Sequence, residues 1–194
     1  FPPMRIITKD EFFLQIDEFE QKVKDGEVFV YPTDTIYGIG CNAMNNDAVE
    51  HIRKLKDRSK APFSVIAPSK NWIRENCVVD DTAEKWLEKL PGMYTLILPL
   101  KNPDCVAKGV CDGKTLGIRM PKHWIRALVR TLDTPLVTTS VNKSGQSFMR
   151  SVDDIDHEIK MHVSFIIDEG PLEHRPSNVV NLTGETVTIR DRSK

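Results

Sequence analysis

The chain has 194 residues, of which 40% are hydrophobic and 28% are charged, and its formal net charge is -1. This length and apolar content suffice for one hydrophobic core, so we expect one domain over residues 1–194. A near-neutral charge excludes binding of polyanions by bulk charge, although it is compatible with a local basic site. The apolar runs are short, which excludes a transmembrane helix.

The N-terminus and the cysteines predict a cytoplasmic protein. No charged region followed by a long apolar run opens the chain, as a secretory signal would require. Met4 fits a natural start, so residues 1–3 are left out of the fold expectation. The four cysteines form no C-x-x-C pair and the five histidines are scattered, so their spacing identifies neither a disulfide framework nor a metal site.

Capping residues and apolar periodicity predict the helices. Thr8 and Glu11 have capping-box spacing, and Gly26 stands where that helix should end. The predicted helices cover residues 8–26, 47–55, 71–77, 81–90 and 124–132, and a further helix begins at Ser151.

Short runs of β-branched and other apolar residues predict the strands. They cover residues 27–31, 63–67, 95–100, 116–120, 135–139, 163–168, 178–182 and 186–190. Because strands alternate with helices and the end is strand-rich, we expect an α/β or α+β fold. Its sheet should mix parallel and antiparallel pairing and be packed by helices.

Two strands run into small polar residues. In "YPTDTIYGIG", Pro32 ends the strand, and hydroxyl and acidic side chains such as Thr35 follow it. In "PLVTTSVNKSG", the strand runs into Ser140 and Asn142. Each segment is either a tight turn that bonds its own backbone or a set of short donors around a ligand.

Cations occupy two kinds of position. Lys56, Arg58 and Lys60 follow a predicted helix, where they are either a solvent-facing cap that favours the helix dipole or a clamp for phosphate. Arg119 lies within an apolar strand and faces either solvent or a polar cavity. Arg190 ends a predicted strand and Ser177 precedes one, and each residue taken alone is predicted to lie on the surface.

Taken together, these strand ends are rich in hydrogen-bond donors and poor in bases. The chain has neither a defensible Ser-His-Asp order nor a G-x-x-x-x-G-K-[ST] loop. Such a composition suits a reaction at phosphate that depends on positioning and charge stabilisation.

Six segments, in order, resemble motifs of the YrdC/Sua5 family. "PTDTIYGIG" is similar to P-T-[DE]-T-x-Y-G-L, "KDR" to K-x-R, and "LPGMYTLIL" to W-P-G-P-x-T. "GIRMP" is similar to G-x-R-x-P, "TTSVNKSG" to T-S-x-N-x-S-G, and "DEGPLEHRPSNVVNL" to D-x-G…S-T-V-V-D. The resemblance runs from about Ile6 to Arg190 and implies the short form, a YrdC-like domain alone.

The resemblance implies an L-threonylcarbamoyladenylate synthase, a nucleotidyltransferase that makes threonylcarbamoyl-AMP and pyrophosphate from L-threonine, bicarbonate and ATP. Its product serves the t6A modification of tRNA through a downstream transferase complex, with tRNA as an indirect partner. The implied fold is a twisted α/β sheet around an open basic cavity, and Mg²⁺ is expected with the ATP. The implied ATP-binding residues are Lys56, Arg58, Lys60, Asn142 and Arg190. The implied threonine-binding residues are Thr35, Arg119, Ser140 and Ser177.

Three departures from the family pattern concern substrate placement. Ala67 stands where a histidine is frequent, Arg150 lies in a stretch that is usually small and hydroxylated, and Asn181 replaces an acidic residue. The competing interpretation is a YrdC-like module that binds RNA or a nucleotide without synthase activity. Against it, the chain is not basic overall and has no evident aromatic stacking platform.

Overall fold

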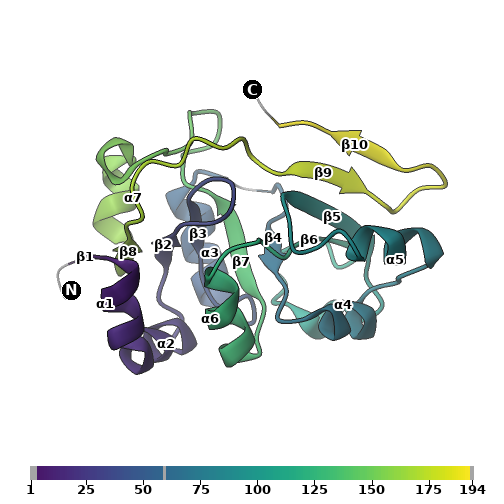
Figure 1. The fold of residues 1–194 in the computed structure, drawn as a ribbon, viewed down its shortest axis with the longest axis horizontal. Helices are drawn as coiled ribbons and strands as arrows, with labels where there is room; N and C mark the ends of the chain where they lie inside the picture. Colours follow the sequence, from purple (N-terminus) through teal and green to yellow (C-terminus); the bar gives the residue numbers. More distant parts are fainter. Residues whose placement is uncertain (1–3, 59, 193–194) are drawn as a thin grey trace.

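A computed structural model describes residues 4–58 and 60–192, which contain one ten-stranded sheet (Figure 1). The strands follow one another across it in the order β1-β8-β2-β3-β7-β4-β6-β5-β9-β10. Their bounds are β1 Arg5–Ile7, β2 Phe29–Tyr31, β3 Gly38–Gly40, β4 Ser64–Ile66, β5 Tyr94–Pro99, β6 Thr115–Arg119, β7 Leu136–Ser140, β8 Phe165–Ile167, β9 Asn178–Asn181 and β10 Thr188–Arg190.

The sheet mixes both kinds of pairing, as expected from the sequence. β8 pairs in parallel with β1 and β2, β4 with β6, and β5 with β9. The other neighbours are antiparallel, including β7 with both β3 and β4. β7 therefore joins the strands on the β3 side of the sheet to those on the β4 side.

Helices pack on both faces of the sheet. They are α1 Lys9–Leu14, α2 Ile16–Lys24, α3 Asn46–Leu55, α4 Lys70–Asn76, α5 Asp81–Leu87, α6 Ile125–Leu132 and α7 His157–His162, with 3₁₀ helices η1 Pro103–Cys105 and η2 Val152–Asp154. Among the described residues, no helix combines the length and apolar character needed to cross a membrane.

Alternation along the strands divides the core into two clusters. Phe29 and Tyr31 pack with α1, α2 and α6, whereas Val30 between them packs in the cluster that includes residues of α3 and α7. Successive strand residues point to opposite faces, so short strands can supply both clusters.

The fold departs from the sequence expectation at several element boundaries. The helix predicted over 8–26 is interrupted at Gln15, which ends α1 and precedes α2. Asn45 rather than Asp47 caps α3, because its side chain accepts a hydrogen bond from the amide of Ala48. The helix expected from Ser151 is the short η2 followed, after a break, by α7.

Candidate functional site

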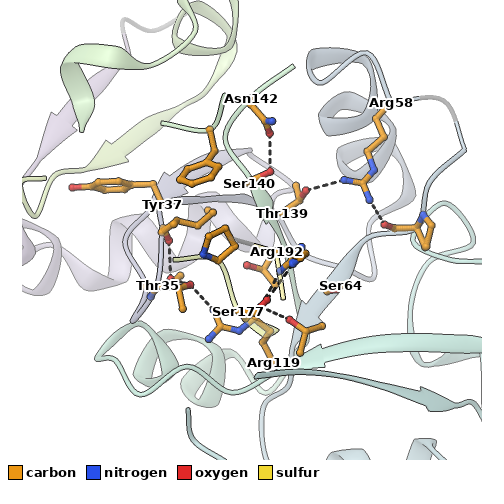
Figure 2. A pocket seen from close by; sticks show the side chains of 18 of the residues that line it. Thr35, Tyr37, Arg58, Ser64, Arg119, Thr139, Ser140, Asn142, Ser177 and Arg192 are labelled. Carbon is orange, nitrogen blue, oxygen red and sulfur yellow. Dashed lines mark hydrogen bonds between the residues drawn. The ribbon is translucent and has the colours of Figure 1, made fainter. Parts of the chain in front are cut away.

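A polar cavity of about 260 Å³ lies at the strand ends near the middle of the sheet (Figure 2). Its wall comes from segments far apart in the chain. They are Thr33, Thr35, Ile36, Tyr37, Gly38, Arg58, Pro62, Ser64, Thr95, Arg119, Thr138, Thr139, Ser140, Asn142, Gln146, Phe148, Pro176, Ser177 and Arg192. Hydroxyl groups and arginines dominate this set, and it includes neither an aspartate nor a glutamate.

Gly117 in β6 creates the room for part of this wall. A Cβ atom at Gly117 would lie 2.4 Å from the hydroxyl oxygen of Ser64 and 3.4 Å from a methyl carbon of Thr95. Because side chains two residues apart in a strand share a face, Gly117 also clears the face from which Arg119 projects. The G-x-R spacing therefore provides both an open wall and a cation.

Lys56 does not face solvent, contrary to the expectation for a cation at a helix end. It is 1% exposed, and its ammonium group donates to the backbone oxygen of Ser140, the Ser140 hydroxyl and Oδ1 of Asn142. These acceptors use all three N–H groups of a lysine, so Lys56 lies behind the wall and holds two residues that form it. Burial, with a smaller effect of Arg58, lowers the pKa of Lys56 to about 7.

The turn after α3 sends Lys56 and Arg58 in different directions. The amide of Arg58 bonds to the carbonyl of Arg53 at 3.0 Å, and that of Asp57 to the carbonyl of Lys54 at 3.2 Å. This is the Schellman arrangement, in which the residue past the cap is left-handed, and Asp57 has a φ of 51°. Lys56 thereby points into the protein while Arg58 reaches the cavity.

Arg58 is half-buried and lines the cavity. Its guanidinium donates to the carbonyl of Pro62 at 2.6 Å and to the hydroxyl of Thr139 at 3.4 Å (Figure 2). It also donates to the carbonyl of Ala61 at 3.3 Å. Three of the five N–H groups of an arginine are thus occupied, and two remain for a ligand.

Arg119 faces the polar cavity rather than solvent, and these were the two orientations that its place in an apolar strand allowed. It is 5% exposed and pairs with the carboxylate of Asp34 at 2.7 Å. It also donates to the hydroxyl of Thr35 at 3.1 Å and to the carbonyls of Gly92 and Tyr94 at 3.1 and 3.5 Å. These bonds occupy four of its five N–H groups, so Arg119 can donate one bond to a ligand without rearrangement.

Arg192 is a site residue that the sequence did not reveal. Its guanidinium donates to the carbonyl of Ser177 at 3.2 Å and to the Ser177 hydroxyl at 2.8 Å, and that hydroxyl lies 2.6 Å from the hydroxyl of Thr95. Among the described residues these are its only hydrogen bonds, which leaves three of its N–H groups without a partner there. Burial and the nearby charges of Arg119, Arg190 and Arg58 lower the pKa of Arg192.

Three of the cations expected at the site lie outside the lining, namely Lys56 behind the wall and, on the surface, Lys60 and Arg190. Arg190 ends the edge strand β10 and is exposed, as is Lys60. The remaining expected residues are brought together: Thr35, Arg58, Arg119, Ser140, Asn142 and Ser177 all line the cavity. Arg192 follows Arg190 by two residues and lies beyond β10, and the local sequence gives no signal that separates the two arginines.

The three departures from the family pattern also lie outside the lining. Ala67 is buried, and its amide bonds to the carbonyl of Arg119 at 3.0 Å. Arg150 is exposed and packs over the ring of Phe148, which does line the cavity. Asn181 accepts hydrogen bonds from Thr183. Ala67 and Arg150 therefore do not line the cavity themselves, but each contacts a residue that does.

The lining does not provide a protein-bound magnesium site. It contains no carboxylate, and the nearby Asp34 uses its oxygens on Arg119 and on the amide of Lys122. Within the described part of the chain, no group of three or more His, Cys, Asp or Glu side chains could hold a metal ion. Proteins usually bind Mg²⁺ through one or two carboxylates together with substrate phosphates, and the side chains of this lining offer no carboxylate.

Comparison with known proteins defines the class of this chain. Residues 21–192 match the model of the Sua5/YciO/YrdC family, which carries the description "Telomere recombination". The chain therefore belongs to the Sua5/YciO/YrdC family, and its twisted mixed sheet with packed helices is the YrdC-like α/β fold.

The chain is similar in sequence to two kinds of protein, threonylcarbamoyl-AMP synthases and uncharacterized YciO proteins. Threonylcarbamoyl-AMP synthase of Bacillus subtilis is 35% identical over 162 residues, which cover 81% of this chain and 46% of that protein. The uncharacterized protein YciO of Escherichia coli is 31% identical over 185 residues, covering 91% of this chain and 88% of that one. The chain thus spans about half the length of the Bacillus synthase but most of YciO.

Solved structures give the same picture. The crystal structure of YciO superposes with a TM-score of 0.82 at 27% identity, over 97% of this chain and 93% of that one. A Pyrococcus abyssi Sua5 complexed with L-threonine superposes with a TM-score of 0.80 at 25% identity, over 96% of this chain and 56% of that chain.

Proposed function

We propose that the chain is an L-threonylcarbamoyladenylate synthase, which joins L-threonine, bicarbonate and ATP into threonylcarbamoyl-AMP and pyrophosphate. The observation that carries the proposal is a cavity lined by three arginines and many hydroxyls, with no carboxylate in its wall. Such a wall favours a substrate with several negative charges, as a nucleoside triphosphate has. Membership of a family that includes named synthases supports the choice of reaction.

The chemistry needs no covalent intermediate on the protein. The free amine of threonine attacks the carbon of bicarbonate, and the carbamate forms with loss of water. A carbamate oxygen then attacks the α-phosphorus of ATP, a new P–O bond forms, and the bond to the leaving pyrophosphate breaks. The protein accelerates these steps by holding the reactants in line and by stabilising charge on the phosphates.

The free donors suggest how the substrates are divided. Arg58 and Arg192 have N–H groups to spare and would contact the phosphates, with Asn142 beside them. Lys56 would support ATP from behind the wall by holding Ser140 and Asn142. Mg²⁺ would enter with ATP, bound to its phosphates. Lys60 and Arg190 would reach the nucleotide only if their exposed side chains fold inward.

Threonine would occupy the opposite part of the cavity. Arg119 offers one N–H group to the carboxylate, and Thr35, Ser140 and Ser177 offer hydroxyls to the amine and side chain. The product would pass to an enzyme complex that transfers the threonylcarbamoyl group to tRNA.

The proposal is tested by pyrophosphate release from the purified chain. We expect release only when ATP, bicarbonate and threonine are all present, together with a product of the mass of threonylcarbamoyl-AMP. Serine in place of threonine and bicarbonate-depleted buffer are the controls. Turnover without threonine would refute the synthase reaction. Binding of RNA that weakens steeply with salt, in the absence of any turnover, would instead support the non-catalytic binding module.

A further inference from the structure

The side chain of Arg53, in the last turn of α3, donates hydrogen bonds to carbonyls outside that helix, including that of Arg58. Its Nη1 donates to the carbonyl of Ala61 at 2.7 Å and to the carbonyl of Arg58 at 3.2 Å, and its Nη2 donates to the carbonyl of Gly109 at 2.6 Å. One guanidinium thus joins the end of α3, the segment after it and a distant loop.

Arg53 binds both the amide and the carbonyl of the Arg58 backbone. The carbonyl of Arg53 accepts the amide of Arg58 at 3.0 Å, while its side chain donates to the carbonyl of Arg58. Both polar groups of the Arg58 backbone are therefore bound by one residue. This leaves the peptide of Arg58 little freedom to rotate, because each backbone bond opposes a different displacement.

The two arginines share further partners. The carbonyl of Ala61 accepts from both guanidinium groups, at 2.7 Å from Arg53 and 3.3 Å from Arg58. The ring of Phe63 has the Cζ atom of Arg53 4.2 Å from its centroid and that of Arg58 5.1 Å from it. Phe63 is fully buried, so the ring is a rigid platform for both cations.

We propose that Arg53, which does not line the cavity, is the positioning residue for Arg58 and thereby sets the affinity of the cavity for polyphosphate. The role in nucleotide binding rests on the proposed function. A lysine could keep the charge of Arg53, but it lacks the planar fork that reaches several carbonyls at once.

A double-mutant cycle tests the proposal. Arg53→Met, Arg58→Met and the double variant are compared by the KM for ATP in pyrophosphate release and by the Kd for tripolyphosphate. We expect Arg53→Met to raise both constants about tenfold, the usual consequence of losing one hydrogen bond to a charged group. The KM for threonine should change less than twofold. Adding Arg53→Met to Arg58→Met should have no further effect.

A second readout needs neither ATP nor catalysis. In the native protein the Nε–H of Arg58, bonded to the carbonyl of Ala61, should give a shifted and slowly exchanging NMR signal. Arg53→Met should return this signal to the position of an exposed arginine, and Arg53→Lys should do so in part while keeping the native melting temperature. Arg74→Met is the matched control, because Arg74 is paired with Glu84 on the surface.

The outcomes separate this inference from the proposed function. An unchanged Arg58 signal in a folded Arg53→Met or Arg53→Lys variant overturns the inference whether or not the chain is a synthase. Multiplicative losses of tripolyphosphate affinity in the double variant do the same, since they show that Arg53 acts without Arg58. Failure of the native chain to use ATP, with the NMR change observed, overturns the synthase proposal and leaves the positioning role standing.

Discussion

At the scale of residues, Lys56 shows how a buried cation can be tolerated without a carboxylate. Three oxygens of Ser140 and Asn142 surround its ammonium group. Hydrogen bonds satisfy the donors of a buried charge but offset only part of the loss of hydration. This explains why its pKa falls while its position stays well defined.

Replacement of Lys56 should therefore affect folding as well as binding. Lys56→Met removes the charged donor to the Ser140 carbonyl and hydroxyl and to the Asn142 amide oxygen, which keeps only the bond from the Ser140 hydroxyl. We therefore expect a loss of about 2–3 kcal/mol in the free energy of unfolding. Arg58→Met, at a half-buried position with neutral partners, should cost about 1 kcal/mol. Urea denaturation followed by circular dichroism measures both. Equal and small losses would place Lys56 in a solvated cap.

The difference between the native protein and Lys56→Met should grow with pH. The folded protein releases the proton of Lys56 near pH 7, whereas the unfolded chain keeps it to about pH 10.5. Over this window the unfolded state binds more protons, so the native protein gains stability as the pH rises. Urea curves at pH 6 and pH 9 measure the change. A pH-independent difference would contradict the lowered pKa.

Arg119 is the residue at which threonine and ATP effects should separate. In Arg119→Lys the ammonium group can still pair with Asp34, but it loses the fork that also reaches Thr35 and Gly92. We expect the KM for threonine to rise at least about tenfold, as for a charge-assisted bond, with the KM for ATP within about twofold. Threonine titration at saturating ATP and bicarbonate is the measurement.

Arg130→Lys provides the matched control for Arg119→Lys, since Arg130 lies exposed on α6. A native threonine titration in Arg119→Lys would remove Arg119 from the substrate site. A parallel rise in both KM values would show that the exchange disturbs the whole cavity.

At the scale of elements, the β9–β10 ribbon carries the last wall of the cavity. β10 is exposed along its length and pairs with β9 alone, at the edge of the sheet (Figure 1). Beyond β10 the chain runs on alongside the start of β9, where the guanidinium of Arg192 donates to the carbonyl and the hydroxyl of Ser177. A weakly packed ribbon therefore places a cation of the site, which makes that cation more easily displaced than Arg58 or Arg119.

Arg192 and Arg190 differ in this respect and can be compared directly. Because Arg192 lines the cavity with three N–H groups unoccupied, Arg192→Met should raise the KM for ATP about tenfold or more. Arg190→Met should have a smaller effect, because Arg190 lies outside the lining. Steady-state kinetics of the two variants measure the order, and the reverse order would restore Arg190 to the ATP site.

At the scale of the whole molecule, patterns with a local cause were predictable. The capping box of Thr8 and Glu11 forms, and Phe12, Phe19 and Val23 are buried as their helical spacing predicts. The described residues form ten strands where eight were predicted, and β3 was missed because two of its three residues are glycines. Tertiary contact requires one of them: a Cβ atom at Gly40 would lie 2.2 Å from the carbonyl oxygen of Val137.

What escaped prediction depends on partners that are distant in the chain. The acceptors that bury Lys56 lie 84 and 86 residues away. Local charge pattern favoured a solvent-facing cap, since nothing near Lys56 in the sequence shows where those acceptors lie. Arg192 was missed for the same reason, because only the path of the chain after β10 brings it to Ser177.

The left-handed residue Asp57 has a consequence for how chains of this kind can diverge. Lys56 lies behind the cavity wall and Arg58 lines the cavity, although only Asp57 separates them in the chain. The bond from the Arg58 amide to the Arg53 carbonyl fixes this one-residue spacing. A residue inserted or deleted between Lys56 and Arg58 would break this bond and turn one cation away from its partners. Insertions and deletions should therefore accumulate outside this turn. Where related chains differ from this one at Asp57, glycine should be the most frequent replacement, because it adopts the left-handed conformation without strain.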